Sequence, residues 1–185
     1  MGPRPYAVYP LRAIDLSAAE RHPPIVETEL HLVWQTEEDT QTFAQALALK
    51  PALRNAFIEL RGDLGAGKTT LVRHLLRALG VTGRIKSPTY AVVEPHTVAL
   101  ASSPGGPPQE LDIWHFDFYR FNDPREWEDA GFRDLFASPG LKLAEWPEQA
   151  AAALPTPDLS VQIDTQADDT RHVTLTAHSI TGMGL

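Results

Sequence analysis

The chain has 185 residues, of which 43% are hydrophobic and 22% charged, and this is enough apolar material for one domain with a buried core. It contains no cysteine, which excludes disulfides and thiolate metal sites, and no apolar run approaches the roughly 18–20 residues of a membrane helix, so we expect a cytoplasmic protein with no membrane association. The net charge is −8, and segment 107–170 contains fourteen acidic and four basic residues. This excess of acid predicts either a solvated acidic face or a docking surface for a basic partner, and it argues against direct binding of nucleic acid.

The amino-terminal segment, residues 1–29, contains five of the sixteen prolines, no sustained periodicity and no apolar core of a secretory signal. We predict an irregular extension there and one folded domain over residues 30–185. The domain is expected to open with a short strand at Leu30–Trp34. Thr36 and Asp39 then have the spacing of a capping box, which predicts the start of a helix.

The next elements are a strand at Ala56–Leu60, a glycine-rich loop, and a helix over Lys68–Leu79. Leucine and valine recur along this helix at the spacing of one apolar face, and Gly80 stands where a helix-ending glycine is expected. A buried strand that runs through a glycine loop directly into a helix is the arrangement that phosphate-binding loops use.

The second half of the chain is rich in strand signals, with alternating apolar residues separated by proline and glycine. The predicted elements are strands at Thr89–Glu94 and Asp112–Tyr119 joined by a long hairpin connection, a short helix with Pro124 in its first turn, a strand at Leu141–Trp146, a helical segment over 148–154, and strands at 159–163 and 172–177. Strand, loop and helix followed by further strands indicate an α/β fold with a mixed sheet.

The glycine loop carries the strongest chemical signal. Gly62, Gly67, Lys68 and Thr69 fit the pattern G-x-x-x-x-G-K-[ST]. The glycines allow the backbone N–H groups of residues 63–69 to converge on phosphate oxygens at the start of the following helix. Lys68 is expected to reach the β- and γ-phosphates, and the hydroxyl oxygen of Thr69 is expected to coordinate Mg²⁺.

Two acids at predicted strand ends are candidates for the rest of a nucleotide-hydrolysing site. Asp117 and Glu145 each end an apolar run, so one can hold Mg²⁺ and the other can orient water, or each can simply pair with a nearby base. Which acid takes which role stays open. Thr89 lies in the stretch "KSPTY", which is either a loop that senses the γ-phosphate or a plain turn before a strand.

The sequence favours ATP over GTP, since it lacks the [NT]-K-x-D pattern that guanine-specific proteins usually carry. A small-molecule kinase is a possible alternative, but segment 95–112 contains no arginine for a phosphate-binding lid. A non-catalytic module whose docking surface is set by bound nucleotide is a second alternative. The sequence offers no clear candidate for an arginine finger that would stabilise the charge on the phosphates. We therefore expect slow hydrolysis by the isolated chain.

Four stretches occur in order along the chain: "GDLGAGKTT", "SPTY", "HFDFYR" and "EWPE". This ordered set resembles the TsaE (YjeE) family from about Leu30 to the end of the chain. The resemblance implies a P-loop ATPase that works with TsaD- and TsaB-like proteins in threonylcarbamoylation of adenosine 37 of tRNA, with tRNA an indirect partner. It also implies a P-loop NTPase-like three-layer sandwich around a mixed, mainly parallel sheet.

The resemblance carries over residue by residue to a site with ATP and Mg²⁺. It implies that Lys68, Thr89, Asp117 and Glu145 take part in catalysis, and that Thr69 with Glu145 or Asp117 holds the metal. The nucleotide-binding positions are then Asp63, Leu64, Gly65, Ala66, Gly67, Lys68, Thr69, Thr70 and Trp146. Trp146 is either a core side chain or one that stacks on adenine or contacts a partner; Tyr119 and His115 are expected to pack or hydrogen-bond inside the fold.

Overall fold

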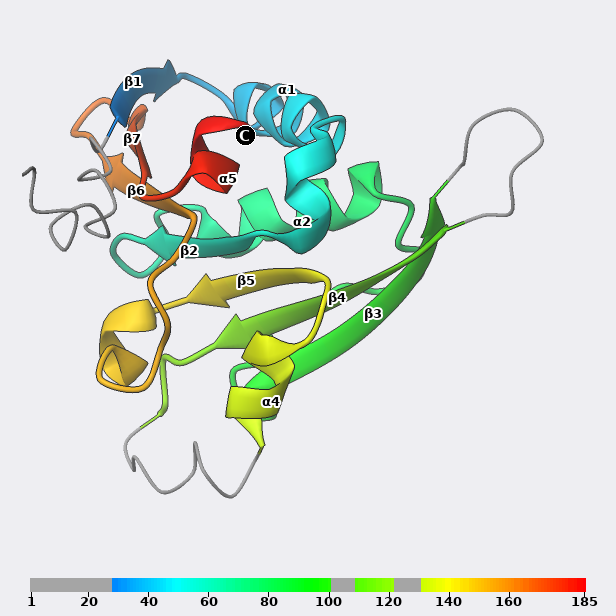
Figure 1. Cartoon of the computed structure of the whole chain (residues 1–185). Helices are drawn as coiled ribbons and strands as arrows, with labels where there is room; N and C mark the ends of the chain where they lie inside the picture. Colours follow the sequence, from blue (N-terminus) through cyan, green and yellow to red (C-terminus); the bar gives the residue numbers. More distant parts are fainter. Residues whose placement is uncertain (1–27, 101–108, 122–130) are drawn as a thin grey trace, which may run out of the picture.

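The computed structural model describes residues 28–100, 109–121 and 131–185, which form a seven-stranded sheet with helices on its faces (Figure 1). The strands are β1 (Thr28–Trp34), β2 (Phe57–Arg61), β3 (Val93–Leu100), β4 (Gln109–Asp117), β5 (Leu141–Glu145), β6 (Leu159–Thr165) and β7 (Arg171–Ala177). The helices are α1 (Glu37–Ala48), α2 (Lys68–Ala78), α4 (Phe132–Ala137) and α5 (Ile180–Met183), with 3₁₀ helices η2 (Pro51–Asn55) and η3 (Pro147–Ala150). Within these three ranges no helix has the length and apolar character needed to cross a bilayer.

The strand order is β1-β7-β6-β2-β5-β4-β3. The central strands β6, β2, β5 and β4 run parallel, while β7, β1 and β3 join the flanks in antiparallel pairs. The mixed sheet with a parallel centre is therefore confirmed. Glu145 is the register partner of both Leu60 on β2 and Asp117 on β4, so the carboxyl ends of three parallel strands meet at one edge, where α/β folds place their ligands.

Side chains of the central strands alternate between two apolar clusters on opposite faces of the sheet. Ile58 and Leu60 of β2 belong to the larger cluster, which also contains the buried faces of α1 and α2. Phe57, which precedes Ile58 and points to the opposite face, belongs to a phenylalanine-rich cluster with Phe116 of β4 and Phe132 of α4. Helices α1 and α2 thus cover one face and α4 the other (Figure 1), which confirms the three-layer arrangement.

The ends of α1 and α2 follow the predicted local chemistry. The Asp39 carboxylate accepts the N–H groups of Thr36 at 3.0 Å and Gln35 at 2.8 Å, and these two backbone hydrogen bonds lower the pKa of Asp39. At the end of α2, Gly80 has φ 100° and donates its N–H to the carbonyl of Arg77 at 3.0 Å. This left-handed turn is the glycine stop predicted from sequence.

The hairpin of β3 and β4 differs from the prediction. Residues Thr89–Ala91 lie in a turn, and β3 runs over Val93–Leu100, through residues expected to be an irregular connection. The stretch 95–111 is rich in proline, glycine and serine, which predicted a loop. β3 is, however, an edge strand, where Pro95 can leave its missing N–H on the unpaired side. Only part of the predicted connection, residues 101–108, lies outside the described residues.

Other boundaries also shift. β1 begins at Thr28, two residues before the predicted domain start, whereas the rest of the predicted extension lies outside the described residues. The helix predicted from Pro124 falls mostly on residues that are not described. The helix predicted after Pro147 is only the short 3₁₀ turn η3, and the four-residue α5 was not predicted.

Candidate functional site

The glycine loop connects β2 to α2 at the carboxyl edge of the sheet. Gly62 has φ 133°, and a Cβ atom built there would lie 2.3 Å from the carbonyl oxygen of Ile163 on β6, so only glycine fits the close approach. Gly67, with φ 113°, is the N-cap of α2, and no side chain among the described residues caps that first turn. The first N–H groups of α2 therefore point into the loop without a side-chain acceptor, which is the geometry that binds anions.

Lys68 lies inside this loop rather than in solvent. Its Nζ donates to the carbonyls of Gly62 and Asp63, at 2.8 Å for the latter, and sits 3.9 Å from the ring centroid of Trp146. The residue is only 4% exposed, and burial lowers the pKa of Lys68, against the opposing effect of the nearby Glu145 and other carboxylates. Lys68 is buried because the loop curls around its side chain.

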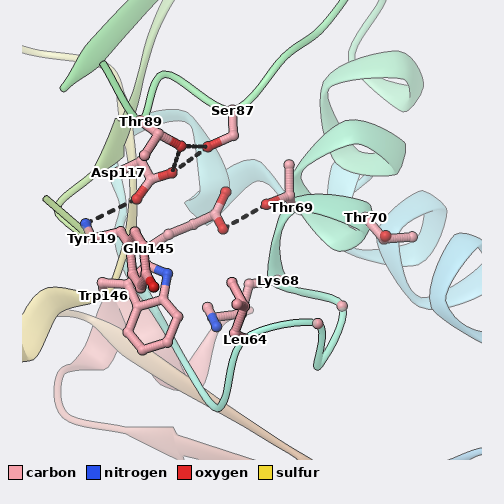
Figure 2. Close-up of a pocket in the computed structure, with 12 residues that line it drawn as sticks. Leu64, Lys68, Thr69, Thr70, Ser87, Thr89, Asp117, Tyr119, Glu145 and Trp146 are labelled. Carbon is pink, nitrogen blue, oxygen red and sulfur yellow. Dashed lines mark hydrogen bonds between the residues drawn. The ribbon is translucent and has the colours of Figure 1, made fainter. Parts of the chain in front are cut away.

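Thr69 and Glu145 meet across the sheet edge. The Thr69 hydroxyl donates to Glu145 Oε2 at 2.7 Å, and the other carboxylate oxygen, Oε1, is 2.8 Å from Nε2 of His115 (Figure 2 shows the Thr69 contact). Glu145 is 2% exposed and His115 is fully buried. Nδ1 of His115 has no hydrogen-bond partner among the described residues. If the ring proton is on Nε2, His115 donates to Glu145, and Nδ1 carries only a lone pair without a donor. Both oxygens of Glu145 are thereby fixed in direction.

Asp117 forms a separate group with two hydroxyls from the loop before β3. Its Oδ2 accepts from Ser87 and, at 2.7 Å, from Thr89, while Oδ1 accepts the N–H of Tyr119 at 3.0 Å. Ser87 and Thr89 also contact each other at 2.8 Å. Figure 2 shows this group and the Thr69–Glu145 pair entering one cavity from neighbouring strands. The turn that carries Thr89 is thus tied to the sheet by Asp117.

These groups line one cavity of about 280 Å³, which we call the P-loop cavity. Its lining residues are Leu64, Gly65, Gly67, Lys68, Thr69, Thr70, Ser87, Thr89, Asp117, Tyr119, Glu145 and Trp146. Several hydroxyls, two carboxylates, one lysine and the free end of a helix therefore face the same space. Among the described residues no set of three or more His, Asp or Glu side chains is placed to hold a metal ion without help from a ligand.

Comparison with known proteins identifies the family. A family model described as threonylcarbamoyl adenosine biosynthesis protein TsaE matches residues 34–173, which is most of the chain. The chain belongs to the TsaE family. The resemblance drawn from the four ordered sequence stretches is therefore confirmed.

Individual members agree with this assignment. A Haemophilus influenzae protein named tRNA threonylcarbamoyladenosine biosynthesis protein TsaE is 39% identical over 143 residues, covering 77% of this chain and 84% of that protein. The Bacillus subtilis protein of the same name is 33% identical over 147 residues, covering 79% and 85%. The crystal structure of Bacillus subtilis YdiB superposes with a TM-score of 0.59 at 28% identity, over 83% of this chain and 88% of that one.

Most residues predicted for the site of this TsaE-family chain line the P-loop cavity, with two exceptions. Asp63 contributes its carbonyl to Lys68 instead of lining the cavity, and the Ala66 side chain is buried behind the loop at 1% exposed. Tyr119, expected in the core, is 43% exposed and lines the cavity, with its ring 4.9 Å from that of Trp146. Trp146 also lines the cavity and is only partly buried.

Sequence reasoning missed Ser87 and the contact between His115 and Glu145. Ser87 precedes Thr89 by two residues, and the "SPTY" stretch held the signal, because two hydroxyls at this spacing can share one acceptor. His115 was expected to be packed or hydrogen-bonded, and it is both. Its partner could not be read from the strand alternation, which sets only the face on which a side chain lies.

Proposed function

We propose that this chain binds ATP with Mg²⁺ and hydrolyses it slowly, in support of tRNA threonylcarbamoyladenosine synthesis in the cytoplasm. The observation that carries the proposal is the Thr69–Glu145 hydrogen bond of 2.7 Å beside the uncapped start of α2. It brings a hydroxyl, a buried carboxylate and phosphate-binding N–H groups to one point, which is the combination that nucleotide hydrolysis requires.

The donor set fits Mg²⁺. Mg²⁺ prefers hard oxygen ligands and is bound through one or two carboxylates, waters and substrate phosphates rather than an all-protein cage. The Thr69 hydroxyl and the Glu145 carboxylate supply such oxygens, and His115 keeps the carboxylate aimed toward Thr69. We therefore assign Thr69 and Glu145 to the metal. When bound, the ion neutralises charge that builds up on the β- and γ-phosphate oxygens.

We assign the other role, the orientation of the attacking water, to Asp117. It lies one strand farther from the P-loop and holds the hydroxyls of Ser87 and Thr89, so it fixes the turn that faces the phosphates. We assign Asp117 with Thr89 to orienting water at the γ-phosphorus. Water attacks that atom, the bond to the bridging β–γ oxygen breaks, and ADP and phosphate result. Lys68 stabilises the negative charge of the leaving oxygen once its contacts with the loop carbonyls give way to phosphate.

Slow turnover by the chain alone follows from the charges that face the cavity. Lys68 is the only cation among the described residues that line it, and Arg120 lies outside, 4.6 Å from the centroid of the Tyr90 ring. P-loop hydrolases without an arginine toward the phosphates are about 10³–10⁵-fold slower than assisted ones. TsaD- and TsaB-like partners are the proteins that we propose complete or organise the site, with tRNA a partner only through them.

The test follows the fate of γ-labelled phosphate with purified protein. We expect slow release of inorganic phosphate that needs Mg²⁺, a rate increase when the cell's own threonylcarbamoyl transferase subunits are added, and loss of hydrolysis in Glu145→Gln. Transfer of label to a metabolite in an acceptor panel would show a kinase instead. A Glu145→Gln variant that hydrolyses nothing yet fully supports tRNA modification would show a non-catalytic module. Hydrolysis at the wild-type rate in Glu145→Gln would refute the metal assignment.

A further inference from the structure

The basic residues of this chain are unevenly spread. Residues 64–93 contain five bases and no acidic residue, whereas the other eleven bases share the rest of the chain with all twenty-four acids. Lys68, the first of the five, belongs to the P-loop cavity. The other four, which we call the basic strip, are Arg73 and Arg77 on α2 and Arg84 and Lys86 in the segment that follows it. A molecule with a net charge of −8 therefore carries one local group of positive charges.

The helix and the following segment are joined through Arg77. Arg73 and Arg77 are exposed and four residues apart on α2, so their side chains are neighbours on one face of the helix. The guanidinium of Arg77 donates to the carbonyl of Val81 at 2.9 Å and to that of Gly83. These bonds hold the chain just before Arg84 against the end of the helix. The basic strip thus continues from α2 into the next segment.

The far end of the basic strip lies on the same short segment as part of the candidate site. Arg84 and Lys86 are exposed, whereas Ile85 between them is buried. Ser87 lines the P-loop cavity, where its hydroxyl donates to Asp117 (Figure 2). This alternation is typical of extended backbone. A partner bound to Arg84 and Lys86 would therefore contact the segment that supplies Ser87 to the cavity.

The charges of the basic strip are not compensated within the described part of the chain. Arg73, Arg84 and Lys86 form no hydrogen bond or ion pair with any described residue. Arg77 donates to backbone carbonyls, and no described carboxylate lies within ion-pair distance of it. An exposed group of charges without counterions on the protein attracts a surface of opposite sign.

We propose that the basic strip is a docking surface for a carboxylate-rich face of the TsaD- and TsaB-like subunits, an inference that rests on the function proposed above. A protein suits the strip better than RNA does. Four adjacent positive charges match a limited acidic patch on a folded partner, whereas an RNA backbone is negative along its whole length and is repelled by the acidic remainder of this chain. The partner can still hold tRNA with basic residues elsewhere on its surface, because charge complementarity acts patch by patch.

The test measures the association of the purified chain with the cell's own threonylcarbamoyl transferase subunits, in the presence of ATP and Mg²⁺, at several salt concentrations. The double variant Arg84→Glu with Lys86→Glu should associate about 10–100-fold more slowly at low salt and dissociate at nearly the wild-type rate, because exposed charges act mainly on the encounter. The corresponding pair of alanine substitutions should give a smaller loss. High salt should bring the wild-type and variant rates together, because it screens exposed charges.

The matched control is the double variant Lys50→Glu with Arg133→Glu. Both residues are exposed and lie outside the basic strip, and the change in net charge is the same. This control should associate nearly as fast as wild type. In all these variants the slow, Mg²⁺-dependent release of phosphate by the chain alone should stay at the wild-type rate, because none of the replaced side chains lines the P-loop cavity.

Four results would count against the docking surface in different ways. Equal slowing by the control pair would show that net charge, and not the basic strip, sets the association rate. An unchanged rate in the strip variant would place the contact elsewhere on the chain. Loss of binding to labelled tRNA, with binding to the subunits intact, would make the strip an RNA-binding surface. If wild type neither released phosphate nor bound the subunits, the proposed function itself would fail, and the docking assignment with it.

Discussion

At the scale of single residues, the contact between His115 and Glu145 fixes the direction of the carboxylate that we propose as a ligand of Mg²⁺. His115 is fully buried and directs one oxygen of Glu145, while Thr69 holds the other. Side chains that orient a metal-binding group from behind typically affect metal affinity or activity by about 10–100-fold. We therefore propose that His115 is a positioning residue, which acts through the carboxylate of Glu145.

We expect His115→Ala to raise the Mg²⁺ concentration needed for half-maximal hydrolysis by about 10–100-fold. Binding of ATP without Mg²⁺ should stay near wild type, because the P-loop contacts do not involve His115. His115→Gln, which keeps a side-chain donor, should recover part of the loss. A magnesium titration of phosphate release measures the effect. An equal loss of metal-free ATP binding would mean that His115 supports only the fold.

The candidate site was predictable from sequence where a residue's role follows from its own segment. The Walker-type spacing identified Lys68 and Thr69, and position at a strand end identified Asp117 and Glu145. The burial of Lys68 and the position of Tyr119 beside the cavity were not predictable, because both side chains lie against Trp146, which is distant in sequence. The alternation along a strand predicts the face of the sheet on which a side chain lies, but it does not predict which distant residue that side chain contacts.

At the scale of elements, the P-loop is held against β6 as well as between β2 and α2. Gly62 approaches the carbonyl of Ile163 so closely that no side chain fits, whereas at Gly65, with φ 82°, a Cβ atom would meet nothing within 4 Å. The two glycines therefore have different structural roles. Gly62 allows packing of the loop on the sheet, and Gly65 allows only a left-handed turn.

Gly62→Ala should accordingly destabilise the protein by about 3 kcal/mol or more, since backbone must move to relieve the contact. Gly65→Ala should cost about 1–2 kcal/mol, the usual cost of a left-handed conformation for a residue with a side chain. Chemical denaturation of both variants measures the difference. Equal destabilisation would mean that the loop shifts freely relative to β6.

The elements themselves were predicted best where periodicity and end signals agreed. Helix α2 has an apolar face, an uncapped glycine start and Gly80 just after its end, and its predicted bounds differ by one residue from those observed. β3 was misplaced because residues 95–111 are rich in proline, glycine and serine, and only the sheet order reveals that β3 is an edge strand, where a proline is tolerated. Local signals cannot report whether a strand has one neighbour or two.

At the scale of the whole molecule, the net charge of −8 separates this chain from proteins that hold tRNA by its phosphates. The acidic segment includes β4, β5 and β6, so the bias lies within the folded domain as well as in its loops. This charge supports our proposal that contact with tRNA comes through a more basic partner. An excess of acidic residues favours association with such a partner electrostatically.

We expect the purified chain to bind tRNA more weakly than about 100 µM at physiological salt, the weak limit of non-specific binding. Fluorescence anisotropy with labelled tRNA, repeated at low salt, measures this. Addition of TsaD- and TsaB-like proteins should bring the chain into a complex with tRNA. Micromolar binding by the chain alone, falling steeply with salt, would contradict the indirect role.

The pairing of β1 with β7 has a consequence for the order in which the molecule becomes complete. β1 is the first described strand, yet its partner β7 is almost the last element, with Trp34 in register with Arg171. Contacts so distant in sequence form late and close long loops. A chain leaving the ribosome can assemble β2, α2 and β5 around the P-loop before β7 exists. The pairing of Trp34 with Arg171 has to wait, so the edge of the sheet formed by β1 should become ordered only at the end of synthesis.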